Sequence, residues 1–149
     1  MEFSEQLHLL ISMYLSKSEK LCKWLLLGLI LLNIASPFLW NHMQMTKHMR
    51  GFQYDIIAFA LTMSAIISAI SMIGWAMICQ EKKTGKYFLL FCHIPSAVVY
   101  SIGILYFSVV LLAGFESYLA LRFLLPLLFE FLVSVSVIVL QHFWTRYIL

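Results

Sequence analysis

The stretch FLLPLLFEFLVSVSVIVLQHFW, residues 123–144, decides the fold class of this chain. A helix needs about 20 apolar residues to cross the hydrocarbon core of a membrane, and this stretch supplies 22 positions with one charged residue. That residue is Glu130, and none of the seven positions on either side of it is charged. Because a carboxylate in hydrocarbon is costly, we expect Glu130 to have a structural or functional role.

The rest of the chain has the same apolar character. Of its 149 residues, 62% are hydrophobic and 11% are charged, whereas soluble domains carry about 25% charged residues. No water-soluble core of this length could hide so much apolar surface. We therefore expect a protein embedded in a lipid bilayer. The net charge of +3 is spread over the ends of the apolar runs, so it predicts topology and no nucleic-acid partner.

Four apolar runs predict an all-α membrane protein, with four transmembrane helices in an antiparallel bundle. The expected spans are residues 24–40, 56–79, 87–113 and 120–144, within one domain at residues 21–149. Before them, apolar residues at helical spacing predict an amphipathic N-terminal helix at residues 1–20. This helix could lie on the membrane surface or on a partner, or it could fold against its own bundle.

Basic residues predict the orientation. With four spans, both chain ends share one side of the membrane, and that side holds seven basic residues: Lys17, Lys20, Lys23, Lys82, Lys83, Lys86 and Arg146. The other side holds three: Lys47, Arg50 and Arg122. The positive-inside rule then predicts cytoplasmic termini. The chain has no glycosylation sequon, and we expect a multi-pass protein of a bacterial inner membrane.

The residues with catalytic potential match no enzyme pattern. The chain contains no metalloprotease HExxH, no phosphate loop, no paired carboxylates and no Ser-His-Asp set. Cys22, Cys79 and Cys92 have the spacing of no zinc or redox motif and are expected to be free thiols. We therefore predict a non-enzymatic protein without a cofactor.

The polar residues of the last span form a stripe. Arg122, Pro126, Glu130 and Ser134 follow one another at steps of four, and Gln141 continues roughly along that line. This stripe should face the bundle or a partner protein, because contact with lipid would cost several kcal/mol. We expect Glu130 to be uncharged there unless Arg122 or water reaches it.

Depth suggests which groups could meet Glu130. A helix rises about 1.5 Å per residue, so Glu130 lies roughly 20 Å above the inner boundary and His93 roughly 9 Å above it. Tyr100 lies at nearly the same depth as Glu130 and is its expected partner. Asn33, near the middle of the first span, is expected to be an interhelical hydrogen-bonding group.

Two further patterns leave alternatives open. Ala60, Ser64, Ser68 and Ser71 share one face of the second span, which predicts a helix-packing face or, alternatively, a polar pore lining. The basic connection at residues 80–86 is expected to turn at Gly85. The first loop contains five soft or imidazole ligands that would suit Cu(I), although a plain polar connector is the simpler interpretation. These candidates are His42, Met43, Met45, His48 and Met49.

Two hypotheses about function follow. In the first, the protein acts by binding another integral membrane protein, as a regulatory, immunity or conjugative entry-exclusion factor or as an accessory subunit. In the second, it is a small oligomeric transporter or channel subunit, whose path is lined by Ser64, Ser68, Ser71 and Glu130. A homo-oligomer is compatible with both.

Overall fold

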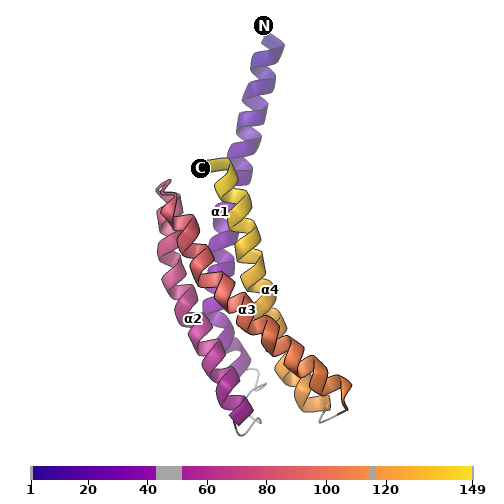
Figure 1. Ribbon diagram of the computed structural model, residues 1–149. Helices are drawn as coiled ribbons and strands as arrows, with labels where there is room; N and C mark the ends of the chain where they lie inside the picture. The colour runs from indigo at the N-terminus through magenta and orange to yellow at the C-terminus, as the bar shows by residue number, and fades with distance from the viewer. Residues whose placement is uncertain (1, 43–51, 115–116, 149) are drawn as a thin grey trace.

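The computed structural model describes residues 2–42, 52–114 and 117–148, and it consists of four helices (Figure 1). They are α1 (Glu2–His42), α2 (Phe52–Cys79), α3 (Thr84–Leu112) and α4 (Ser117–Ile148). Each contains a segment long and apolar enough to cross a membrane. These segments are Phe3–Trp40, Ile56–Cys79, Thr84–Leu112 and Ala120–Arg146. The prediction of an all-α membrane protein with four spans is confirmed.

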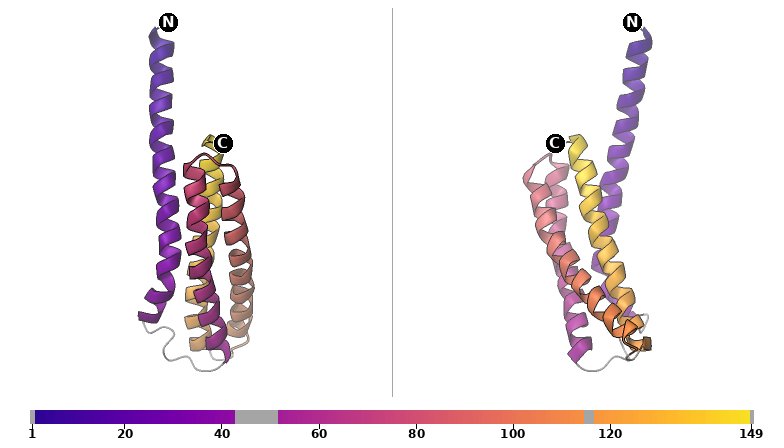
Figure 2. Two further views of the ribbon diagram at one scale, coloured as in Figure 1. Left: turned by 90° about the vertical axis from the view of Figure 1, so that its left-hand side faces the viewer. Right: turned by 45° about the vertical axis from the view of Figure 1, so that its right-hand side comes forward.

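The helices form a closed ring. Helix α1 packs against α2 and α4, and α3 packs against the same two helices. Successive helices run in opposite directions in Figures 1 and 2, and the two chain ends lie toward the same end of the bundle. The turn between α2 and α3 also lies at that end, which we call the terminal end. Each helix therefore directs one face at a shared interior.

Helix α1 differs from its prediction because it does not break near residue 20. It runs without interruption for 41 residues, which corresponds to about 60 Å, twice the hydrocarbon thickness. The connecting sequence KSEKLCK, residues 17–23, contains neither Gly nor Pro. Its Lys, Glu and Leu residues all favour helix, so nothing local ends the helix there.

The N-terminal part of α1 extends past the bundle. Residues 3–17 are all exposed, and Figure 2 shows this segment continuing beyond the end of α4. We call residues 3–17 the projection. The alternative in which this segment folds against its own bundle is wrong, whereas its contact with a membrane surface or a partner stays a prediction.

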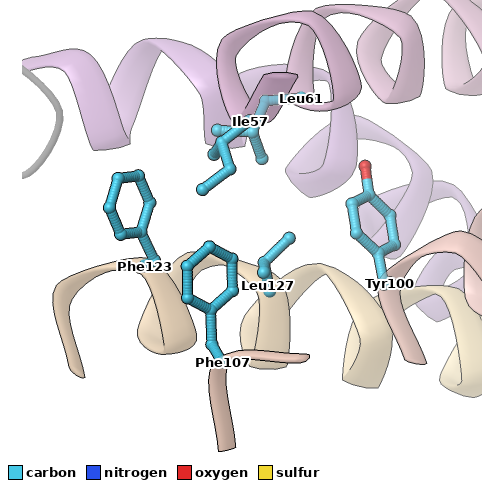
Figure 3. Packing of buried hydrophobic residues seen from close by; sticks show 6 residues of the cluster. All are labelled: Ile57, Leu61, Tyr100, Phe107, Phe123 and Leu127. Carbon is cyan, nitrogen blue, oxygen red and sulfur yellow. The ribbon is translucent and has the colours of Figure 1, made fainter. Parts of the chain in front are cut away.

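Two apolar clusters hold the ends of the bundle. Figure 3 shows the cluster far from the chain ends, where Phe107 of α3 stacks on Phe123 of α4 with ring centroids 4.9 Å apart. We call it the aromatic cluster, and its buried members are Ile57, Leu61, Tyr100, Phe107, Phe123 and Leu127. The cluster at the terminal end draws on all four helices: Leu26, Ile30, Ile78, Leu89, Val137 and Trp144. Between these two clusters the interior is polar.

Helices α2 and α3 approach most closely at two glycines. A Cβ atom on Gly85 would meet the carbonyl oxygen of Gly74 at 2.6 Å and Cγ1 of Ile78 at 2.8 Å. Gly85 therefore lies inside α3 as a packing residue, and the prediction that the chain turns there is wrong. The turn occurs earlier, where Glu81 adopts a φ of 60°.

Candidate functional site

Eleven polar side chains are buried among the described residues, and they come from all four helices. We call this set the polar core. Its members are Asn33, Ser36, Ser64, Ser68, Ser71, His93, Ser96, Glu130, Ser134, Gln141 and Thr145. In a bilayer, water and lipid offer such groups no hydrogen bonds at this depth, so they must find partners in one another or in the backbone.

Glu130 joins three helices. Its side chain is 0% exposed, and its Oε2 lies 3.5 Å from the Ser64 hydroxyl of α2. The same hydroxyl lies 3.0 Å from Oδ1 of Asn33 on α1. The Ser36 hydroxyl donates to the Asn33 backbone carbonyl at 3.1 Å. We call Asn33, Ser64 and Glu130 the central layer.

The proton count of the central layer indicates how its hydrogen bonds run. A serine hydroxyl carries one proton and cannot donate to Asn33 and Glu130 at once. If Glu130 carries a proton, it donates to Ser64, and Ser64 donates to Asn33 Oδ1. Each of the two contacts then has its own donor proton, so the geometry fits an uncharged Glu130 carboxyl.

Two atoms of the central layer and one of the neighbouring Trp40 lack a standard hydrogen bond. Glu130 Oε1, Asn33 Nδ2 and Trp40 Nε1 have no such partner among the described residues. Ser36 and Trp40 nevertheless lie near enough to act on the Glu130 carboxyl. The Trp40 ring is held edge-on against Phe129, with centroids 5.5 Å apart.

Tyr100, the expected partner of Glu130, bonds elsewhere. Its hydroxyl donates to the backbone carbonyl of Ala60 at 3.3 Å, and its ring belongs to the aromatic cluster. The methyl side chain of Ala60 leaves that carbonyl accessible to an approaching ring. Ser64 makes the direct contact with Glu130, and the Tyr100 hydroxyl lies near enough to interact with both.

His93 forms a second polar contact, nearer the terminal end. Its Nε2 lies 3.1 Å from the Ser71 hydroxyl, which itself donates to the Ser68 carbonyl at 2.7 Å. Because the only Ser71 proton is used, Nε2 must be the donor, and Nδ1 is left as an acceptor. Nδ1 has no partner among the described residues. His93 and Glu130 thus bond to different residues.

The serine row of α2 links the two contacts. Ser64 meets Glu130 and Ser71 meets His93, and they are separated by seven residues, or about 10 Å of helix. Ser68 lies between them, and its hydroxyl has no partner among the described residues, like that of Ser134 on α4. All three serines are buried. The serine row therefore faces the bundle interior and supplies one partner to each of the two polar contacts.

The α4 stripe faces the bundle interior. Pro126, Glu130, Ser134 and Gln141 are all buried, and Arg122, near the start of α4, is half-buried. The sequence allowed a stripe that faces the bundle or a partner. The burial of Glu130 leaves it no surface to offer to another protein in this arrangement.

The structure does not test the proposed copper loop. The side chains of His42, Met43, Met45, His48 and Met49 lie outside the described residues. Among the residues that are described, no group of three or more His, Cys, Asp or Glu could hold a metal ion. Cys22 and Cys79 are half-buried free thiols, and Cys92 is a buried one.

Comparison with protein-family models, with curated proteins and with solved structures found no match to this chain. The polar core and the exposed helix surfaces therefore carry the functional argument on their own.

Proposed function

We propose that this protein is a non-enzymatic factor of a bacterial inner membrane that acts by binding another integral membrane protein. The observation that carries the proposal is an exposed, largely apolar seam along α1, interrupted at the half-buried Ser18. The seam lies on the side of α1 that faces away from the bundle.

The seam begins in the projection and continues through the span at alternating steps of three and four residues. In the projection it contains Leu7, Ile11 and Tyr14, which are 50%, 51% and 75% exposed. After the half-buried Ser18, its members in the span are all exposed. They are Leu21, Leu25, Gly28, Leu32, Ala35 and Leu39. Steps that average 3.5 residues are the spacing by which one helix packs along another.

Most charged residues of α1 lie away from this seam. Glu5, Glu19, Lys20 and Lys23 lie on other faces of α1, and the exposed Lys17 lies beside the seam, three residues after Tyr14 and four before Leu21. Lipid can cover the part of the seam within the bilayer, but the projection extends beyond the other three helices. An apolar face that continues in one register from the span into the projection is suited to a second helix that follows the same path.

Gly28 makes room for that helix. A shallow groove of about 320 Å³ surrounds it, lined by Leu21, Trp24, Leu25, Gly28, Leu29 and Leu32. A Cβ atom on Gly28 would meet nothing within 4 Å in this chain. Small residues at an exposed helix surface let two helices approach closely within a membrane. A side chain of the partner helix can therefore enter this groove.

The proposal assigns Glu130 to the bundle rather than to the partner. Its carboxyl joins α1, α2 and α4 from inside, so it would hold the shape that presents the seam. The terminal end would face the cytoplasm. In support, this end holds the chain ends and the basic turn at residues 82–86.

The projection supports the class of factor that we propose. Among the described residues it is the segment that extends beyond the bundle, and a projecting helix suits a regulatory, immunity or conjugative entry-exclusion factor, or an accessory subunit. Each of these acts by occupying a surface of another membrane protein. A second copy of the chain would be an alternative occupant of the seam.

Affinity purification from native membranes tests the proposal, with Gly28→Leu as the variant and Ala69→Leu as its control. Both replace a small exposed residue of a span, but Ala69 lies on α2, away from the seam. We expect one membrane protein to be recovered with the wild type and with Ala69→Leu, and at least tenfold less of it with Gly28→Leu. Equal recovery with both variants would contradict the proposal, and recovery of untagged copies alone would identify a homo-oligomer.

A second candidate function is the movement of a proton or small ion, and the polar core favours it. Within the polar core, six buried atoms on four helices lack partners among the described residues: Asn33 Nδ2, Ser68 Oγ, His93 Nδ1, Glu130 Oε1, Ser134 Oγ and Gln141 Oε1. Water molecules entering the bundle could connect them. Flux through proteoliposomes, measured for protons, monovalent cations and copper, tests this function. No flux above that of empty liposomes would exclude it.

A further inference from the structure

A basic pocket lies at the terminal end of the bundle, where α3 begins and α4 ends. It has a volume of about 410 Å³ and is lined by Lys83, Lys86, Tyr87, His142, Thr145 and Arg146. Three of these six side chains are cationic, and none of the six is acidic. Thr145 also belongs to the polar core, whereas the other five belong neither to the polar core nor to the α1 seam.

The three cations lack an acidic partner within the described part of the chain. Lys83, Lys86 and Arg146 make no ion pair among the described residues, although Glu19 and Glu81 lie at the same end of the molecule. Three like charges around one pocket repel one another, and a bound anion would offset the part of that repulsion that solvent does not screen. Lys83 and Arg146 are exposed and Lys86 is half-buried, so their side chains can converge on a bound group.

The position of the pocket matches the level of lipid phosphates. Arg146 is the last residue of the fourth candidate span, and Lys86 lies in the first turn of the third. Tyr87 is 68% exposed beside them, and exposed tyrosines are enriched at the boundary between hydrocarbon and headgroups. Basic pockets between transmembrane helices on the cytoplasmic side are suited to anionic headgroups.

Hydrogen-bond donors complete the site. Arginine presents a fork of N–H groups to two phosphate oxygens, and lysine adds point charges. His142 is exposed and can donate one more hydrogen bond. The Thr145 hydroxyl already donates to the Gln141 carbonyl at 2.7 Å, so Thr145 lines the pocket without donating into it.

We propose that this pocket binds a phosphate group, supplied by the headgroup of an anionic phospholipid or by free phosphate. The anion bridges the start of α3 and the end of α4, two segments that the chain joins only through the far end of the bundle. Binding there would stabilise the terminal end, independently of any protein that occupies the α1 seam.

Native mass spectrometry of the purified full-length protein tests the proposal. Detergent micelles are supplemented with phosphatidylglycerol, phosphatidylcholine or inorganic phosphate. The variant replaces Lys83, Lys86 and Arg146 with Gln. Its matched control, Lys17→Gln, Lys20→Gln and Lys82→Gln, removes the same charge from residues that do not line the pocket.

We expect one phosphatidylglycerol per chain, at least tenfold weaker binding to the pocket variant, and unchanged binding to the control. Phosphatidylcholine should bind at least tenfold more weakly than phosphatidylglycerol. If the wild type and the control retain inorganic phosphate but not phosphatidylglycerol, and the pocket variant retains neither, the pocket is a phosphate site whose ligand is the free anion. Equal retention of phosphatidylglycerol by pocket variant and control, or no retention of either phosphate source, would overturn the proposal. Thermal unfolding of the pocket variant in detergent should remain cooperative, which verifies that weaker lipid binding does not come from loss of the fold.

Discussion

The central layer and the aromatic cluster are neighbours in the bundle, but different forces hold them together. Around Glu130, three helices meet through directional hydrogen bonds to Ser64 at 3.0 and 3.5 Å. Around Phe123, the contact is a ring stacked on Phe107 at 4.9 Å, with Ile57 and Leu61 packed nearby. One region relies on hydrogen bonds between specific atoms, and the other relies on shape.

The bilayer changes the relative value of these forces. Lipid tails are as apolar as leucine, so an aromatic side chain gains little free energy by leaving lipid for the bundle. A hydroxyl or carboxyl has no partner in lipid and loses much more when its contact is removed. In a soluble protein the aromatic cluster would contribute more to stability. Here we expect the central layer to contribute more.

Replacing Glu130 should have the largest effect. Glu130→Ala removes the group shared by α1, α2 and α4 and leaves a cavity lined by polar atoms, which should cost about 3 kcal/mol of unfolding free energy. Glu130→Gln retains the size and the donor of an uncharged carboxyl, and its cost should be about 1 kcal/mol or less. Equilibrium unfolding in mixed detergent micelles measures both. If Gln proves as damaging as Ala, Glu130 is charged in the folded protein and the uncharged layer described above is wrong.

The second effect tests whether shape can matter as much as hydrogen bonding. Gly85→Ala places a Cβ atom 2.6 Å from the Gly74 carbonyl oxygen, and because backbone atoms cannot move aside locally, α2 and α3 must separate. We expect a loss of about 2 kcal/mol. The control is Gly28→Ala, whose added methyl meets nothing within 4 Å. Thermal unfolding followed by circular dichroism should show a lower midpoint for Gly85→Ala alone.

The elements that sequence predicts well are those that depend on one helix at a time. The second span was expected at residues 56–79 and is observed at Ile56–Cys79, because hydropathy along a single segment determines it. The inward direction of Glu130 and Ser134 follows in the same way from their spacing along α4. Helix α1 was divided wrongly because its lysines mark a membrane boundary, and a helix can continue across such a boundary.

Partners between helices were harder to predict. Tyr100 and Glu130 share a depth and lie near each other, yet the Tyr100 hydroxyl donates to the Ala60 carbonyl and the direct contact of Glu130 is with Ser64. The rotation and tilt of one helix against its neighbour decide which side chains meet. The spacing of residues along a single helix contains no information about that rotation or tilt. The same holds for Gly85, whose importance depends on Gly74 and Ile78 of another helix.

The aromatic cluster gives the third effect. Phe123→Ala removes a buried ring, a change that costs about 3–5 kcal/mol in soluble cores. In a bilayer the transfer contribution is nearly absent and the loss is mainly of dispersion contacts, so we expect about 1 kcal/mol. Unfolding under the conditions used for Glu130→Ala makes the two directly comparable. A larger loss for Phe123→Ala than for Glu130→Ala would reverse the proposed ranking of the two regions.

The smallest effect concerns the contact between Ser71 and His93. Ser71→Ala removes a hydroxyl that accepts from His93 at 3.1 Å, while the Ser68 carbonyl keeps its bond within the helix. Interhelical hydrogen bonds of this kind contribute about 0.6 kcal/mol on average in membranes, and we expect that loss. Ser101→Ala is the matched control, because its hydroxyl bonds only within α3, to the Val98 carbonyl at 2.7 Å. Nitrogen NMR of His93 provides the second measurement, since loss of the acceptor frees Nε2 and should shift its resonance. If the two variants are equally stable and the His93 spectrum is unchanged, the polar contact nearer the terminal end contributes as little to stability as an apolar contact. The stability of the central layer would then come from Glu130 alone.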